Sequence, residues 1–93
     1  MKSVHRLDRN QTIVMVCDMQ EKFIPHVYGK EGILEAAAMM IRSAKILGLP
    51  IIVTEQKKNA FGGTCEVLMK HLNEKTDFFI DKTFVSDYLD SFL

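Results

Sequence analysis

The stretch Thr12-Ile-Val-Met-Val-Cys-Asp-Met-Gln-Glu-Lys-Phe23 decides the fold, because a continuous apolar run stops abruptly at a carboxylate. A short run rich in Ile and Val that ends in polar residues predicts a parallel strand over residues 12–17, buried on both faces. Asp18 follows at the carboxyl end of that strand. Ligands bind at this edge of open α/β sheets, so Asp18 is a candidate general base, with helix or loop capping as the alternative.

A helix is predicted over residues 31–47, because apolar residues recur there at helical spacing. Gly48 follows where a left-handed cap is favoured, and the apolar run over residues 50–54 predicts a second strand. This strand-helix-strand unit brings Gln56 to the same sheet edge as Asp18. The helical residues expected to face the sheet are Ile33, Leu34, Ala37, Met40, Ile41, Ala44 and Leu47.

The remaining chain predicts a loop over residues 57–64, a short amphipathic helix over residues 65–73 and an apolar stretch over residues 78–80. That stretch delivers Lys82, and Ser86 is placed to cap a last helix. The inward residues expected in the short helix are Val67, Leu68 and Leu72.

These elements predict an α/β fold with a partial Rossmann-like parallel sheet of two to three strands and crossover helices. Residues 1–11 are polar and form a lead-in arm, and residues 12–93 form the domain. A complete sheet has about five or six strands, and the chain closes on an apolar Phe92-Leu93 pair, so we expect a truncated domain.

Composition excludes several classes of partner. The 93 residues hold 12 basic and 12 acidic side chains, so no net field favours nucleic acid or an anionic membrane. Apolar runs are too short to span a bilayer, which needs about 20 residues. Two cysteines without a disulfide framework, and a polar amino terminus, predict a cytoplasmic protein.

Neither cysteine is expected to be a nucleophile. Cys17 lies within the first strand and is interpreted as a packing residue. Cys65 lies near a helix start, which favours a thiolate, but Glu66 beside it opposes the charge.

No metal and no cofactor are expected. Asp18-Met19-Gln20 lacks the second carboxylate of an Asp-x-Asp magnesium site. The three histidines have no ligand at a local spacing, and Gly62-Gly63 does not form a phosphate-binding pattern.

Three segments together resemble the isochorismatase-like cysteine hydrolases, most of all the isochorismatase domain-containing proteins. They are Val16-Cys-Asp-Met-Gln-Glu-Lys-Phe23, Pro50-Ile-Ile-Val-Thr-Glu-Gln56, and Lys82-Thr83 with Ser86. The resemblance covers the amino-terminal half of that domain. It implies a six-stranded parallel sheet and an Asp, Lys and Cys triad, in which Asp18 and Lys82 take the first two positions. From the residues alone, Lys82 is better explained as a solvated surface lysine than as a residue that acts on Asp18, and only the resemblance changes that interpretation.

The family's cysteine lies in a later Gly-Ile-Glu-x-x-x-Cys turn, which this sequence does not contain. We therefore expect a hydrolase-family chain that is inactive alone and acts on a small-molecule substrate only when completed by the missing half. The zinc-dependent nicotinamidases carry Asp-x-His where this chain has Glu55-Gln-Lys-Lys58, which disfavours that branch. Phe23 and Gln56 are expected to contact substrate, with packing or loop anchoring as the alternative.

The alternative function is a noncatalytic interaction protein that keeps the half-domain. An uncovered strand edge invites association, so a homo-oligomer is one expected form.

Overall fold

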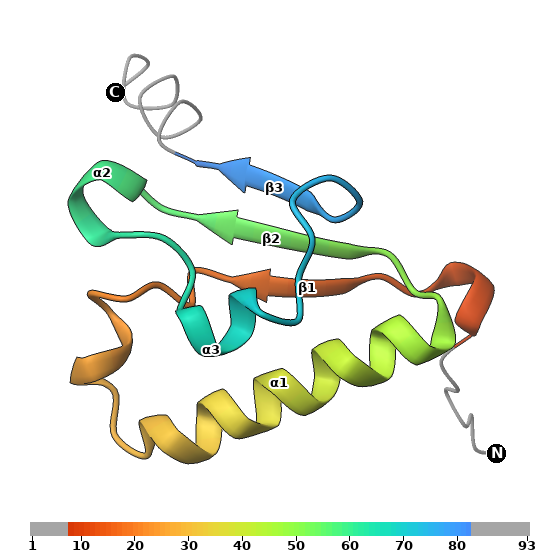
Figure 1. Cartoon of the computed structure of the whole chain (residues 1–93), viewed down its shortest axis with the longest axis horizontal. Helices are drawn as coiled ribbons and strands as arrows, with labels where there is room; N and C mark the ends of the chain where they lie inside the picture. The colour runs from red at the N-terminus through yellow and green to blue at the C-terminus, as the bar shows by residue number, and fades with distance from the viewer. Residues whose placement is uncertain (1–7, 83–93) are drawn as a thin grey trace, which may run out of the picture.

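The fold is a three-stranded parallel sheet covered by helices on one face (Figure 1). The structure is a computed structural model that describes residues 8–82. Strands lie side by side in the order β1-β2-β3, and both pairs are parallel. The α/β class and the three-stranded parallel sheet are confirmed. The elements in chain order are η1 (Arg9–Gln11), β1 (Val14–Cys17), η2 (Ile24–His26), α1 (Lys30–Leu47), β2 (Ile51–Glu55), α2 (Lys58–Phe61), α3 (Glu66–Met69) and β3 (Phe78–Asp81).

The register brings the three strand ends to one edge. Cys17 of β1 is paired with Thr54 of β2, which is paired in turn with Ile80 of β3. The residues that follow each strand therefore emerge beside one another, as expected for parallel strands. This edge is where the predicted polar residues collect.

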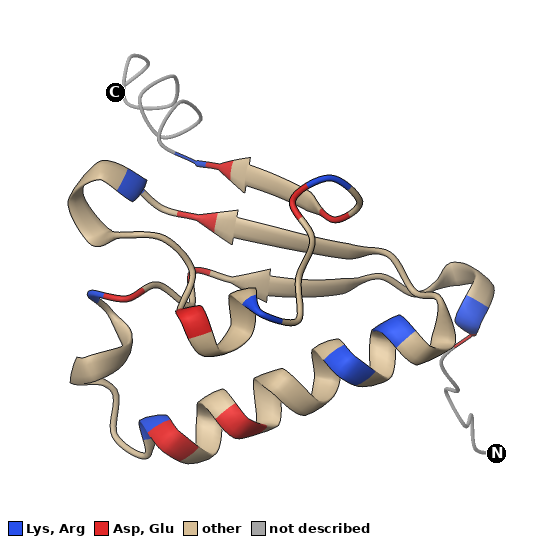
Figure 2. Cartoon of the chain, in the orientation of Figure 1, with Lys and Arg blue, Asp and Glu red and all other residues tan. Residues whose placement is uncertain are grey.

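Helix α1 begins and ends close to its predicted limits. Gly48 caps its carboxyl end with φ of 71°, a left-handed conformation that glycine adopts without steric cost. Acidic residues lie near the start of the helix and basic residues near its end, the arrangement that complements the helix dipole (Figure 2). One of the basic residues, Lys45, pairs at 2.6 Å with the buried carboxylate of Asp77, which ties α1 to the turn before β3.

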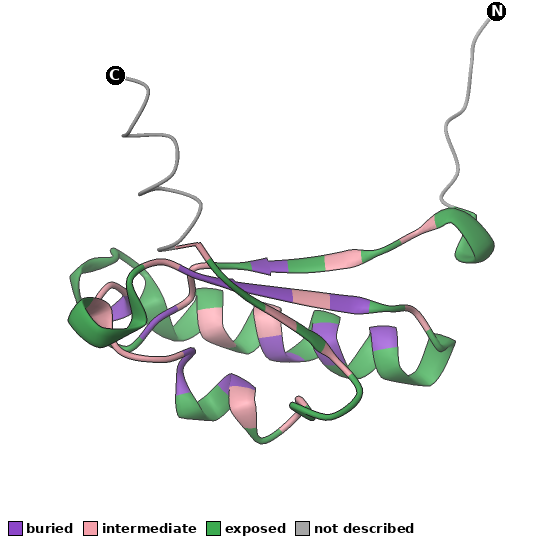
Figure 3. Ribbon diagram, turned by 90° about the horizontal axis from the view of Figure 1, so that it is seen from above, coloured by how far each residue is buried: buried purple, intermediate pink, exposed green. Residues whose placement is uncertain are grey.

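The core lies between the sheet and the two helices α1 and α3, which both cover the same face (Figure 3). Strand β2 is central and almost wholly buried. From α1 the buried side chains are Ala38, Ile41 and Ala44, and two of these are small enough to let the helix approach the sheet closely. The predicted inward residues Ile33, Met40 and Leu47 are instead 40–58% exposed.

The expectation that the first strand is buried on both faces is wrong. Strand β1 alternates, with Val16 buried and Met15 57% exposed. On β3, Phe78 and Ile80 are 61% and 44% exposed. These side chains are exposed because, within the described residues, the helices that pack on the sheet all lie on its opposite face. We call this uncovered surface, formed by Met15, Cys17, Ile52, Phe78 and Ile80, the open face.

Two connecting segments differ from their predicted form. The expected loop over residues 57–64 contains the one-turn helix α2, and the helix expected over residues 65–73 is only the four-residue α3, followed by turns. Leu68 of α3 is fully buried as expected, whereas Val67 is 43% exposed. The helix predicted after Ser86 and most of the amino-terminal arm lie outside the described residues, and residues 9–11 of the arm form the turn η1.

Candidate active site

Asp18 and Lys82 meet at the carboxyl edge of the sheet although they are 64 residues apart in the sequence. The Lys82 Nζ donates to Asp18 Oδ2 at 2.7 Å, and the Thr54 hydroxyl donates to Asp18 Oδ1 at 3.0 Å. The prediction that both residues lie over one edge of a parallel sheet is confirmed by this geometry. Each carboxylate oxygen thus has one fixed donor and retains a further acceptor site.

The backbone holds both residues as extensions of the strands. The Asp18 N–H donates to the Thr54 carbonyl at 3.0 Å, and the Lys82 N–H donates to the Glu55 carbonyl at 2.7 Å. Asp18 has φ of 53°, a left-handed conformation that few residues other than Gly, Asn and Asp adopt readily. The chain therefore turns at Asp18 while its carboxylate remains at the strand ends.

The ion pair is partly open to solvent. The side chains of Asp18 and Lys82 are 30% and 35% exposed. This exposure leaves room for a small molecule to reach the carboxylate, whereas the Thr54 contact fixes its orientation. The arrangement can accept a proton at Asp18 and can stabilise a developing negative charge with the Lys82 ammonium.

Gln20 is a buried residue of this edge that the sequence analysis did not single out. Its side chain is fully buried, and Nε2 donates to the carbonyls of Gln56 at 3.0 Å and Gly62 at 2.7 Å. Its Oε1 accepts from the Gln56 N–H at 2.6 Å. Gln20 therefore joins the segment after β1 to the segment after β2. The available signal was a lone amide two residues beyond Asp18, which does not by itself indicate burial.

Backbone pairing reinforces the same junction. The Glu21 N–H donates to the Gly63 carbonyl, and the Cys65 N–H donates to the Met19 carbonyl, both at 2.9 Å. An isolated antiparallel bridge pairs Gln20 with Thr64 between them. The connection from β2 to α3 is thereby fixed against the connection from β1 to α1.

Comparison with known proteins decides the family. The model of the isochorismatase domain matches residues 12–93. The chain belongs to the isochorismatase family. Isochorismatase family protein 1A of Dictyostelium discoideum is 38% identical over 74 residues, and isochorismatase domain-containing protein 2 of Danio rerio is 34% identical over 64 residues.

Solved structures share the isochorismatase-family fold found here. The MAR1 ribonuclease of Caenorhabditis elegans is 30% identical with a TM-score of 0.78 over 92% of this chain. A hypothetical protein from Trypanosoma cruzi, 22% identical with a TM-score of 0.65 over 84% of this chain, has the same fold. The chain spans 36% of the Dictyostelium protein, 32% of the Danio protein and 48% of the MAR1 chain.

Phe23 and Gln56, the two predicted substrate contacts, have structural partners in this isochorismatase-family chain. The ring of Phe23 stacks on Phe61 with 4.4 Å between centroids and an interplanar angle of 28°. The backbone of Gln56 is held by the Gln20 side chain. These contacts fix the ends of the loop that contains α2, and a role for either residue at a substrate remains a prediction.

Of the two cysteines, Cys17 differs from its predicted environment and Cys65 lies at the predicted helix start. Cys17 is exposed, so its interpretation as a packing residue is wrong, because its side of β1 belongs to the open face. Cys65 is 8% exposed and precedes α3 as its amino-terminal cap, as expected. Burial raises the pKa of the Cys65 thiol, and the carboxylate that adds to this rise is Glu21 rather than the predicted Glu66.

Alkylation is expected to separate the two thiols. At pH 8, iodoacetamide should modify Cys17 at least about tenfold faster than Cys65, because Cys65 is buried and its raised pKa keeps it protonated. Mass spectrometry of timed samples measures both rates, and the chain in guanidinium, where the rates should converge, is the control. Folding raises the Cys65 pKa above its unfolded value. The thiol therefore contributes to the free energy of unfolding at neutral pH, and this contribution is lost as the pH rises from the unfolded pKa through the raised folded pKa. Equal rates in the folded chain would contradict this assignment.

Within residues 8–82 no group of three His, Cys, Asp or Glu side chains is arranged to hold a metal ion. No helix in the same range is long and apolar enough to cross a membrane.

Proposed function

We propose that this isochorismatase-family chain supplies the aspartate and lysine of a cysteine-hydrolase site for a small-molecule substrate, and that the 93 residues alone lack the nucleophile. The observation that supports the proposal is the ion pair of 2.7 Å between Asp18 and Lys82. Its position at the carboxyl edge of a parallel sheet is where such folds bind ligands. The resemblance of the flanking segments to cysteine hydrolases supplies the reaction class.

Each residue has a definite part in the proposed reaction. The Asp18 carboxylate accepts the proton of an attacking thiol, and the resulting thiolate forms a bond to the substrate carbonyl carbon. The Lys82 ammonium stabilises negative charge near the reacting atoms. The proton held by Asp18 then passes to the leaving group as the carbonyl is restored, and water releases the acyl group from sulfur.

Neither cysteine of this chain has the surroundings that the reaction requires. Cys65 is buried, and Glu21 opposes its ionisation. Cys17 is exposed, but within residues 8–82 no hydrogen bond joins its thiol to Asp18 or Lys82. We therefore propose that the nucleophile comes from a group outside these 93 residues.

An added thiol tests the proposal without knowledge of the natural substrate. The 93-residue chain is mixed with p-nitrophenyl acetate, with and without 2-mercaptoethanol, and release of p-nitrophenolate is followed by absorbance. Asp18 should activate the added thiol, so the thiol-dependent rate should exceed that of Asp18→Asn by about tenfold. Without thiol, the two proteins should give the same background rate.

The substitution Asp8→Asn is the matched control, because Asp8 lies before β1 at an exposed position and caps only the turn η1. It should leave the thiol-dependent rate unchanged. Hydrolysis without thiol that depends on Asp18, and that Cys17→Ser abolishes, would show that the chain carries its own nucleophile. Equal thiol-dependent rates for the wild type and Asp18→Asn would show that the ion pair is structural.

The open face supports the second function, an interaction module without catalysis. Met15, Phe78 and Ile80 leave 44–61% of their surfaces exposed, although parallel sheets are normally covered on both faces. The partner that we propose is a second copy of the chain. Light scattering should then show a dimer that Phe78→Lys converts to monomer, whereas Ile46→Lys, at a residue 85% exposed on α1, should not. A wild-type monomer at every concentration would exclude self-association.

A further inference from the structure

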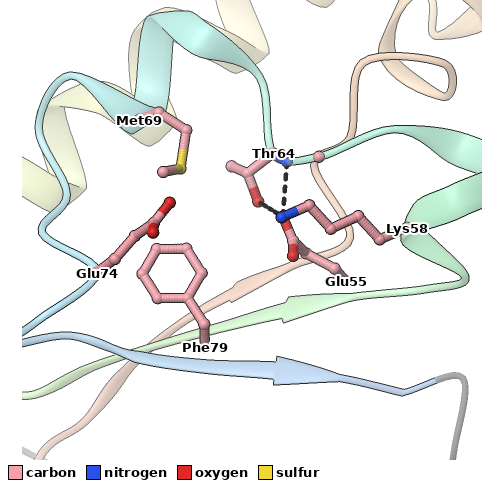
Figure 4. Close-up of a pocket in the computed structure, with 7 residues that line it drawn as sticks. Glu55, Lys58, Thr64, Met69, Glu74 and Phe79 are labelled. Atoms are coloured by element: carbon pink, nitrogen blue, oxygen red, sulfur yellow. Dashed lines mark hydrogen bonds between the residues drawn. The ribbon is translucent and has the colours of Figure 1, made fainter.

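A cavity of about 360 Å³ lies on the helix-covered side of the sheet, between α3 and β3 (Figure 4). Its volume is in the range of small-molecule sites. Charged and hydroxyl groups gather on one side of it, and a thioether, a second carboxylate and an aromatic ring on the other. The lining residues are Glu55, Lys58, Gly63, Thr64, Met69, Glu74 and Phe79.

The cavity is separate from the Asp18–Lys82 pair. Thr54, whose hydroxyl contacts Asp18, and Glu55, which lines the cavity, are consecutive residues of β2. Successive side chains of a strand point to opposite faces of the sheet. A ligand in the cavity therefore lies on the opposite face of the sheet from the candidate active site.

Glu55 is the polar anchor of the cavity. The residue is 6% exposed, and its Oε2 accepts from the Thr64 N–H at 2.8 Å and the Thr64 hydroxyl at 2.9 Å. Within the described part of the chain, Oε1 accepts no hydrogen bond. Every fully buried side-chain oxygen in that part has a hydrogen-bond partner, so Oε1 must keep some accessible surface. That surface faces the cavity that Glu55 lines. Thr64 fixes the carboxylate while leaving one oxygen for a ligand.

The charges of the lining favour a cation. Glu55 and Glu74 carry two negative charges, and Lys58 carries one positive charge. In the region that the structure describes, Lys58 lies beside Glu55 but forms no ion pair with it, and the lining keeps one net negative charge. The ring of Phe79 adds a negative π face, which attracts cations, and Met69 adds apolar surface on the same side of the cavity, with the Glu74 carboxylate between them (Figure 4).

We propose that this cavity binds a small organic ammonium ion that carries an apolar group. The ammonium donates to Glu55 Oε1 and lies within reach of Glu74, and the apolar group packs on Phe79 and Met69. Lys58 lines the same cavity with its side chain directed toward Glu55 (Figure 4), and it turns out to solvent when the ammonium binds. A carboxylate ligand of the same size is rejected, because it would place a third negative charge beside the two glutamates.

The test uses the full 93-residue chain and three probes of similar shape, which are benzylammonium, benzyl alcohol and benzoate. Backbone amide signals are followed by NMR during titration, and the Thr64 N–H is a direct reporter because it donates to Glu55. Benzylammonium should shift the Gly63 and Thr64 signals saturably. It should bind at least about tenfold more tightly than benzyl alcohol, as a charge-assisted hydrogen bond implies, and benzoate should not bind there.

Variants connect the binding to the cavity. Glu55→Gln keeps an acceptor for Thr64 but removes the charge, and Glu74→Gln alters an exposed residue of the lining. Each should weaken benzylammonium binding, Glu55→Gln by about tenfold or more and Glu74→Gln by a smaller factor of about three. Glu35→Gln, on α1 and outside the lining, should change nothing.

The outcomes are decisive in either direction. If Glu55→Gln fails to fold, Glu74→Gln and Phe79→Leu still test the site, and both must weaken binding. The proposal is wrong if benzylammonium causes no saturable shifts at Gly63 and Thr64. It is also wrong if benzoate binds equally well, or if Glu35→Gln weakens binding as much as Glu74→Gln does.

Discussion

Gln20→Glu is expected to lower the free energy of unfolding by about 3–4 kcal/mol, because it removes two buried donated hydrogen bonds and adds a buried charge. The amide nitrogen of Gln20 now donates to the carbonyls of Gln56 and Gly62. A carboxylate oxygen in its place would face both carbonyl oxygens at 2.7–3.0 Å. The segments after β1 and β2 would then separate. Urea denaturation followed by circular dichroism measures the loss.

Gln11→Glu is the matched control, since it makes the same chemical change at an exposed residue of η1. Its free energy of unfolding should stay within about 0.5 kcal/mol of the wild type. A loss below about 1 kcal/mol for Gln20→Glu would show that the junction does not depend on this side chain.

Leu68→Ala is expected to cost about 3 kcal/mol, in the range measured for fully buried leucines. Leu68 has no exposed surface and is the buried residue of α3, a helix too short to be stable without tertiary packing. Truncation would leave a void between α3, α1 and the sheet. Urea denaturation gives the change in stability, and hydrogen exchange at the amide of residue 68 gives the local loosening of α3.

Val67→Ala provides the comparison within the same helix. Val67 is 43% exposed, so its truncation should cost less than about 1 kcal/mol. Equal costs for the two substitutions would mean that α3 is not anchored through Leu68. A cost below about 1 kcal/mol for Leu68→Ala would mean that the helix contributes little to the core.

The sequence was sufficient to predict the main elements of the fold. The apolar run of β2, the 3.6-residue spacing of α1 and the Gly48 cap are local signals, and local signals predict local structure. The short helix α2 gave no such signal, because four residues cannot show a helical period. Its ends are instead set by the Gln20 contacts with Gln56 and Gly62.

Burial was predicted less well than secondary structure. An apolar run is the same whether one or both faces of a strand are covered, so it could not show that Met15 and Cys17 lie on the open face. The broad apolar surface of α1 likewise did not identify Ala38 as a buried residue or Met40 as an exposed one. These outcomes depend on which elements pack together, and that is tertiary information.

For the candidate site, the predicted ends of the strands indicated which residues would lie close together. Parallel strands must end at a common edge, so Asp18 and Lys82 could be expected to approach each other once three strands were recognised. The roles proposed for them came from the resemblance, because a lysine after a strand is usually only a surface residue. The sequence did not indicate that Gln20 joins the two segments, because this role depends on hydrogen bonds to residues 36 and 42 positions away.

A double-mutant cycle on the thiol-dependent cleavage of p-nitrophenyl acetate tests most directly whether Asp18 and Lys82 act as one unit. The four proteins are the wild type, Asp18→Asn, Lys82→Met and the double variant, each checked for an unchanged circular dichroism spectrum. If the pair acts together, each single substitution lowers the thiol-dependent rate by about tenfold and the double variant is no slower than either. Independent losses that multiply in the double variant, or rates that do not change in any variant, would contradict a shared role.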